Sequence, residues 1–207
     1  MAVLCSVTSA VGLADVETTV ETTVEHALWR AQDVPFTYRS NVTMYDCRTL
    51  QAKVSGVLVA LGAHAATNVE TFTCQVTHLP NSSSQFARLR ITLVSPVPAT
   101  REARTEVAAS AARVALLERM GVHTAVGKEF PAKWQLVDLV ASRAVRLEAS
   151  DCELLRQLSE QVLPHLAVNV VARNRNCSRS PQRLGKPTLE VRALVPSGAD
   201  GQRSGKG

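Results

Sequence analysis

Apolar residues follow helical or alternating spacing in two segments, and each segment contains the same succession of elements. In the first segment the pattern predicts strands and one helix, at 36–44 (strand), 46–61 (helix), 69–74 (strand) and 86–94 (strand). In the second it predicts 134–140 and 144–147 (strands), a helix that begins near 150, and 168–173 and 188–195 (strands). A capping box of Ser150 and Glu153 is expected to begin the second helix, which ends near Pro164. With 134–140 and 144–147 taken together as its first extended part, the second segment repeats the order of the first: strand, helix, strand and strand.

The two segments also match residue by residue, which predicts an internal repeat. The matching positions are Asp46-Cys47 with Asp151-Cys152, Leu50 with Leu155, Val57 with Val162, Leu61 with Leu166, Cys74 with Cys177, and 89–96 with 189–196. Chance similarity is the alternative. We expect an α+β fold in which two strand-helix-strand-strand repeats are related by a pseudo-two-fold axis and joined by an Ala-rich helix.

The remaining segments divide the chain around one repeat-built domain. The predicted divisions are 1–14 (leader), 15–33 (linker), 34–97 (first repeat), 98–122 (connecting helix), 123–196 (second repeat) and 197–207 (flexible tail). The linker contains a small duplication, and its residues 25–29 are compatible with a helix. The connecting helix is expected over 100–120, with Glu102 in its first turn and Gly121 after its end.

Composition limits the class of protein. The chain has 207 residues, of which 45% are hydrophobic and 4% aromatic, and its net charge is +5. These values exclude a disordered chain, a fibrous repeat and a disulfide-dense miniprotein. No apolar run approaches the roughly 20 residues that a membrane-spanning helix needs, so we expect no membrane span.

The first 14 residues have no charged side chain and end in Gly12-Leu13-Ala14, which is typical of a secretory signal. No Lys or Arg precedes the apolar run, as the basic start of such a signal would require. A late start site or a short buried strand are the alternatives. Export predicts a periplasmic or secreted protein.

The cysteines support export, because four remain if the leader with Cys5 is removed. A helix of about four turns rises ~24 Å, and a following strand of about seven residues returns ~23 Å. This geometry predicts disulfides between Cys47 and Cys74 and between Cys152 and Cys177, which would persist in an oxidising compartment. Bridges between the repeats, or free thiols, are the alternatives; the spacing disfavours zinc.

No catalytic motif is present: the sequence has no nucleophile elbow, phosphate-binding loop or dinucleotide-binding glycine pattern. Its five histidines are scattered. We therefore expect a non-enzymatic binding or structural domain with no cofactor and no metal. The alternative is a small extracytoplasmic enzyme, such as a hydrolase, whose dispersed site would bring a histidine to a Ser, Asp or Glu.

Arginines alternate with apolar residues on the predicted strands, which points to one polar sheet face. The candidates for anion binding are Arg88, Arg90, Arg173, Arg175 and Arg192. Guanidinium groups suit carboxylates and phosphates, so an anionic ligand or a protein partner is expected. A solvated face is the alternative. Nucleic acid is not expected, because these strands offer few aromatic rings for base stacking.

Four short stretches resemble uncharacterised exported proteins of Gram-negative proteobacteria. They are 36–40 (FTYRS), 45–47 (YDC), 61–63 (LGA) and 151–152 (DC). The resemblance covers about residues 34–196. It implies a periplasmic or secreted location and no particular reaction.

Overall fold

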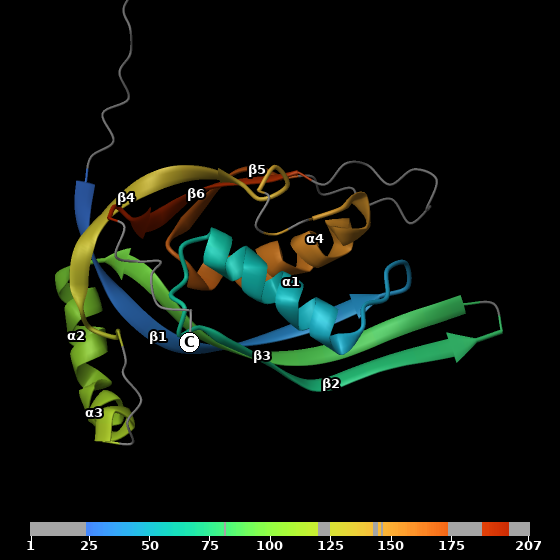
Figure 1. The fold of residues 1–207 in the computed structure, drawn as a ribbon, viewed down its shortest axis with the longest axis horizontal. Coiled ribbons are helices and arrows are strands. Elements are labelled where there is room, and N and C mark those ends of the chain that lie inside the picture. The colour runs from blue at the N-terminus through green and yellow to red at the C-terminus, as the bar shows by residue number, and fades with distance from the viewer. Residues whose placement is uncertain are drawn as a thin grey trace, which may run out of the picture.

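A computed structural model describes residues 24–80, 82–119, 125–142, 145, 147–173 and 188–198. The described strands form one antiparallel sheet in the order β2-β3-β1-β4-β6-β5 (Figure 1). The strands are β1 (Val24–Ser40), β2 (Asn68–Leu79), β3 (Ser82–Pro98), β4 (Glu129–Asp138), β5 (Val168–Arg173) and β6 (Leu189–Pro196). The helices are α1 (Cys47–Ala60), α2 (Arg101–Ala109), α3 (Ala111–Arg119) and α4 (Cys152–Gln161), with short 3₁₀ turns η1 (Ala149–Asp151) and η2 (Leu163–His165). The predicted α+β class is confirmed.

The strands fall into two groups, with α1 and α4 between them (Figure 1). One group is β2-β3-β1 and the other is β4-β6-β5. Buried side chains from both groups and both helices form one hydrophobic core, which includes Phe36 and Tyr38 on β1, Leu50 and Leu58 on α1, Ile91 on β3, Leu154 and Leu158 on α4, and Val191 on β6. This shared core makes the two groups one packed unit.

β1 joins the two groups, but only its first part pairs with β4. Residues 24–28 pair with β4, whereas β3 pairs with β1 without interruption from Ala27 to Ser40. Beyond the β4 pairing, side chains of α4 bind the open edge of β1. The amide of Gln161 bonds the N–H and the C=O of Thr37 at 2.9 Å each, and Gln157 does the same for Arg39 at 2.9 and 2.7 Å. Two glutamines one helical turn apart thus replace a neighbouring strand.

The predicted first helix is confirmed at both ends. Asp46 is the N-cap, and its carboxylate accepts a hydrogen bond from the Thr49 N–H at 2.9 Å. The helix ends at Gly62, whose φ of 87° lies in the left-handed region that favours glycine. A Cβ on Gly62 would lie 2.9 Å from the carbonyl oxygen of Leu194 on β6, so this glycine also allows α1 to approach the other strand group closely.

Residues 24–33, which the sequence analysis assigned to a linker, instead form the first part of β1. The suggested helix at 25–29 is therefore wrong. Ala27 and Leu28 are buried there, between the β3 and β4 pairings. Pairing on both sides outweighs the local preference of a short segment.

The Ala-rich helix is two helices rather than one. Ser110 separates α2 from α3, and its hydroxyl donates to the Val107 carbonyl at 2.7 Å. Such a bond competes with the helical backbone pattern. The strand predicted at 86–94 extends further at both ends, because β3 runs from Ser82 to Pro98.

The predicted capping box of the second helix is wrong. Asp151 precedes α4, and Glu153 bonds Arg156 and Gln157 instead of reaching back. The strand predicted at 144–147 is also not found at its described residues. β4 ends at Asp138, whose carboxylate accepts the N–H groups of the two residues beyond Leu139 and turns the chain.

We predict that Gln157→Leu lowers the free energy of unfolding by about 2 kcal/mol, because it leaves the N–H and C=O of Arg39 without partners. Urea unfolding measures this loss. Gln135→Leu is the control, since Gln135 is exposed on β4. Equal stability of the two variants would show that β1 does not need this cover.

We also predict that Gly62→Ala lowers the free energy of unfolding by at least about 1–2 kcal/mol, the cost of left-handed backbone for a residue with a Cβ. The contact with Leu194 adds to this cost. Gly198→Ala is the matched control, because a Cβ there meets nothing within 4 Å. Thermal and urea unfolding of both variants provide the comparison, and an unchanged Gly62→Ala protein would contradict it.

Candidate functional site

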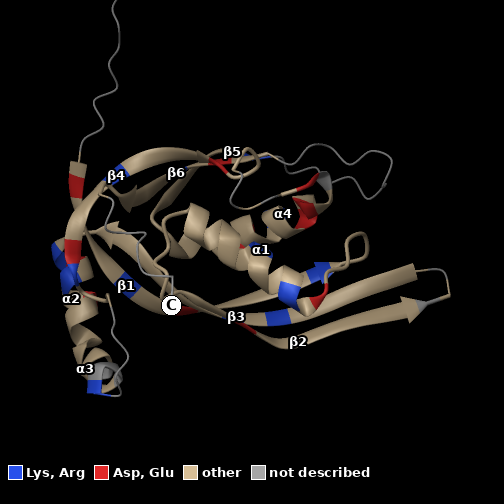
Figure 2. Ribbon diagram, viewed as in Figure 1, with Lys and Arg blue, Asp and Glu red and all other residues tan. Residues whose placement is uncertain are grey.

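The outward side of β1 and β3 carries three arginines in neighbouring positions. The antiparallel register of β1 with β3 places Arg39 opposite Phe86, Thr37 opposite Arg88, and Pro35 opposite Arg90. The intervening residues of both strands are buried in the core, so the arginines lie on the side away from α1 and α4. The ribbon coloured by charge shows basic segments on both strands (Figure 2).

Aromatic rings hold these guanidinium groups in place. The guanidinium carbons of Arg39 and Arg88 lie 5.1 and 5.2 Å from the centroid of the Phe86 ring, and that of Arg90 lies 4.6 Å from the centroid of Phe72. These are cation–π contacts, which orient a guanidinium without neutralising it. We call Arg39, Arg88, Arg90, Phe72 and Phe86 the arginine face.

The arginine face has one acidic neighbour, Glu70 on β2, which lies opposite Arg90 but forms no ion pair with it. All three arginines are exposed, and none of them forms an ion pair with a described residue. Arg88 and Arg90 are two residues apart on one strand, a separation of about 6.6 Å. Arg39 is a diagonal neighbour of Arg88 at about 7–8 Å. The arrangement suits several carboxylate, phosphate or sulfate groups on one ligand.

The structure brings together only two of the five arginines predicted from the sequence. Arg192 pairs with Leu136 and projects outward from the other strand group. Arg173 pairs with Leu189, a core residue, and so belongs to the helix side of β5. Arg175 lies outside the described residues.

Sequence reasoning missed Arg39 and both phenylalanines of the arginine face. Arg39 follows the alternation of Val34, Phe36 and Tyr38, which indicates its polar side. The strand partner that places it beside Phe86 is a matter of register, which that alternation does not reveal. Phe72 was hidden for another reason: it is the extra residue of a bulge between Thr71 and Thr73 on β2.

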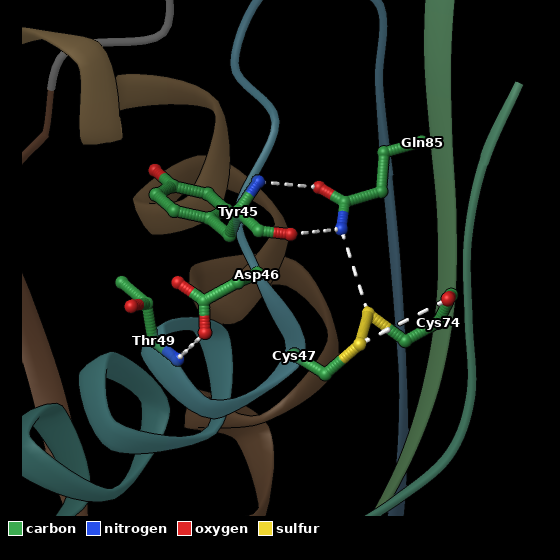
Figure 3. The surroundings of a disulfide bond; sticks show 6 residues. All are labelled: Tyr45, Asp46, Cys47, Thr49, Cys74 and Gln85. Atoms are coloured by element: carbon green, nitrogen blue, oxygen red, sulfur yellow. Dashed lines mark hydrogen bonds between the residues drawn. A yellow bond between two sulfur atoms is a disulfide. The ribbon is translucent and has the colours of Figure 1, made fainter. Parts of the chain in front are cut away.

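The first predicted disulfide is confirmed. Cys47, the first residue of α1, is bonded to Cys74 on β2 with a Cα–Cα distance of 5.9 Å (Figure 3). Gln85 lies beside it: its amide donates to the Cys74 sulfur at 3.6 Å and pairs with the backbone of Tyr45. The bond therefore fixes the start of α1 to the sheet.

The second disulfide stays a prediction. Cys152 is disulfide-bonded, but its expected partner Cys177 lies outside the described residues. Cys152 lies at the start of α4 as Cys47 does at the start of α1. Next to the Cys47–Cys74 disulfide, hydrogen bonds from the side chain and the backbone N–H of Thr49 lower the pKa of the exposed Asp46 carboxyl.

A buried polar cluster around Asp151 connects the two halves of the chain. The fully buried carboxylate of Asp151 accepts hydrogen bonds from the Tyr45 hydroxyl, the Lys53 ammonium at 2.8 Å and the Glu148 N–H. Burial raises the pKa of Tyr45 far above its usual value, with the Asp151 hydrogen bond as the next cause. Burial likewise raises the pKa of Tyr38 to about 12. These tyrosines stay protonated and serve as donors.

Other places in the described part of the chain offer fewer groups that could bind a ligand or a metal ion. Cys152, Arg156, Ser159 and Arg173 line a shallow pocket beside α4, but Arg156 is already paired with two glutamates. In the described part of the chain, no three His, Cys, Asp or Glu residues gather as a metal site. None of the described helices has the length and apolar character to cross a membrane.

Among the described residues, one histidine side chain lies within hydrogen-bond distance of a Ser, Asp or Glu side chain, as a dispersed hydrolase site would need. His78 Nδ1 lies 3.0 Å from the Ser83 hydroxyl on the exposed hairpin of β2 and β3. No described carboxylate bonds either side chain. This pair lacks the third group that orients a histidine base.

Comparison with known proteins adds no relative. No protein-family model, no curated protein and no solved structure matches this chain.

We predict that Lys53→Met lowers the free energy of unfolding by about 3 kcal/mol, because Asp151 then holds a buried charge without its cation. Lys128→Met is the control, since Lys128 is exposed. Urea unfolding at neutral pH distinguishes them. Equal stability of the two variants would show that the Asp151 cluster contributes little to joining the halves.

Proposed function

We propose that this is a non-enzymatic extracytoplasmic protein that binds an anionic ligand or partner through the arginine face. The observation that carries the proposal is the set of three exposed guanidinium groups, each stacked on a phenylalanine ring and none paired with a described carboxylate. A face made only for solubility needs no such orientation. The stacking holds the positive charges in place before a ligand arrives, which lowers the entropic cost of binding.

The Cys47–Cys74 disulfide supports the extracytoplasmic part of this proposal. Disulfides persist in oxidising compartments and are rare in a reducing cytoplasm. The proposed leader at residues 1–14 lies outside the described residues. We propose that the protein is periplasmic or secreted.

We also infer that the two halves are repeats related by a pseudo-two-fold axis. The supporting observation is topological: the chain order β1-α1-β2-β3 gives the strand order β1-β3-β2, and β4-α4-β5-β6 gives β4-β6-β5. The helices of both halves begin at an Asp-Cys pair. On this proposal, Arg192 and the arginine face lie on corresponding surfaces that have diverged in charge.

A small enzyme with a dispersed site is the second candidate. It needs a histidine in a cleft beside a nucleophile and an acid, whereas the His78–Ser83 pair lies on an exposed hairpin. The geometry therefore favours binding.

The binding proposal predicts that Arg39→Gln, Arg88→Gln and Arg90→Gln together raise the Kd for dextran sulfate and for poly-L-glutamate by at least about tenfold. Each lost guanidinium removes a charge-assisted hydrogen bond. Fluorescence anisotropy at low salt measures the Kd. Binding by the unaltered protein should weaken as salt screens the charges.

The control removes the same charge elsewhere, with Arg101→Gln, Arg119→Gln and Arg192→Gln at exposed positions. This protein should bind like the unaltered one. Equal weakening in both triple variants would mean that net charge alone attracts the probes, and the arginine face would then be no site. Circular dichroism confirms that both variants keep the fold.

A further inference from the structure

β2 is the outermost strand of its group and has an outer edge with which no described strand pairs. It is 12 residues long, twice the length of β5 at the opposite end of the sheet. Its sequence, NVETFTCQVTHL, contains no Lys, Arg or Pro, the residues that commonly protect an edge strand from pairing. Phe72 is 59% exposed and Val76 38% exposed, so apolar side chains lie along this edge.

A bulge defines which part of the edge can pair regularly. The register with β3 shifts between Thr71 and Thr73. From Thr73 onward the pairing is regular as far as Leu79, opposite Ser82. Seven residues, about 23 Å of extended chain, therefore present an unbroken row of backbone donors and acceptors.

Positive charge lies next to this edge. The guanidinium group of Arg90 lies over the Phe72 ring of β2, and Arg88 is the cross-strand neighbour of Thr73. On the outward side of residues 73–79, β2 itself offers only uncharged positions, namely Thr73, Gln75 and Thr77. An added strand along residues 73–79 that carries acidic residues on the same side would place them in register with Arg88, opposite Thr73, and with Phe86 and its stacked Arg39, opposite Gln75. Arg90 lies beyond the bulge, opposite Glu70.

We propose that the outer edge of β2 binds an extended, acidic segment of a protein partner as an added strand. Backbone hydrogen bonds to residues 73–79 would supply affinity, and alternate carboxylates facing the arginine face would supply specificity. Side chains on one side of a strand repeat every ~6.6–7 Å, which matches the step from the row of Arg88, opposite Thr73, to the row of Phe86 and Arg39, opposite Gln75. This inference rests on the proposed binding function and names the partner class.

A second copy of this chain fits the edge less well. Pairing two β2 edges would bring the arginines of both copies toward one another, and like charges close together disfavour association. The one acidic residue on β2, Glu70, lies before the bulge and accepts a hydrogen bond from Asn68. Charge complementarity therefore favours a partner of opposite sign.

The test uses the full chain and two peptides of the same charge. One is an eight-residue peptide in which Glu alternates with Val and Thr; the other has the same sequence with every internal amide N-methylated. N-methylation removes the backbone donors and keeps the carboxylates. We expect the first peptide to bind, and the second to bind at least about tenfold more weakly.

A variant tests the edge from the side of the protein. Gln75→Glu with Thr77→Glu adds negative charge, the same sign as the peptide's, along the outward side of β2. This double variant should bind the first peptide at least about tenfold more weakly. The matched control is Gln135→Glu with Asn169→Glu, at exposed positions of the other strand group, and it should bind like the unaltered protein. Circular dichroism and urea unfolding verify that both proteins are folded.

The outcomes separate this inference from the proposed function. If both peptides bind equally, or if neither binds while dextran sulfate does, the edge is not used and only the arginine face remains. If the arginine triple variant binds every probe as well as its control does, the proposed function fails as well. If sedimentation shows a dimer that Gln75→Glu with Thr77→Glu dissociates, a second copy occupies the edge and the inference is overturned.

Discussion

The open edge of β1 is the constraint on which the rest of this structure depends. β1 joins its own strand group to the other one, yet it pairs with β4 only over residues 24–28. Beyond Leu28, every second residue of β1 directs its N–H and C=O to the edge that β4 no longer covers, and these backbone groups need other hydrogen-bond partners. Gln157 and Gln161 of α4 satisfy them at Arg39 and Thr37. β1 can therefore separate from β4 beyond residue 28, because α4 binds its edge at Thr37 and Arg39.

This arrangement explains how one sheet accommodates two helices. Because α4 rather than a strand lies along the second half of β1, the two strand groups separate and their helices fill the space between them (Figure 1). The helix-facing residues of both groups then form one core. Their outward faces are separate surfaces, one with Arg88 and Arg90 and the other with Arg192.

The two outward surfaces differ in their arginines and in the length of their outermost strand. Within the described part of the chain, the β1-β3-β2 group alone has arginines stacked on phenylalanine rings, and the same group ends in the long outer strand β2. Oriented positive charge and an unpaired strand edge therefore occur side by side. The Cys47–Cys74 disulfide ties β2 to α1 on the helix-facing side of the sheet, opposite the arginine face.

Local sequence signals predicted the elements whose ends have a chemical marker. Asp46 and Gly62 delimit α1, β5 was placed correctly at 168–173, and the spacing of Cys47 and Cys74 predicted their bond. Signals failed where distant parts of the chain decide the structure. Residues 24–33 look like a linker until β3 and β4 pair with them. Asp151 stands at the start of α4, but its carboxylate binds Lys53 and Tyr45 instead of capping the helix.

The candidate site was predicted only in part for the same reason. Alternation along β3 correctly placed Arg88 and Arg90 on one outward side. Grouping them with Arg39 requires the β1–β3 register, and excluding Arg173 requires knowing that its neighbour Leu189 is in the core. Neither fact is present in the spacing of a single strand.

The most direct test of binding by the arginine face is an NMR titration that follows the Nε–H signals of the arginines while poly-L-glutamate is added to the full chain. We expect the signals of Arg39, Arg88 and Arg90 to shift together and saturate, while that of Arg192 stays in place. Shifts of equal size at all arginines, or none at these three, would contradict this expectation.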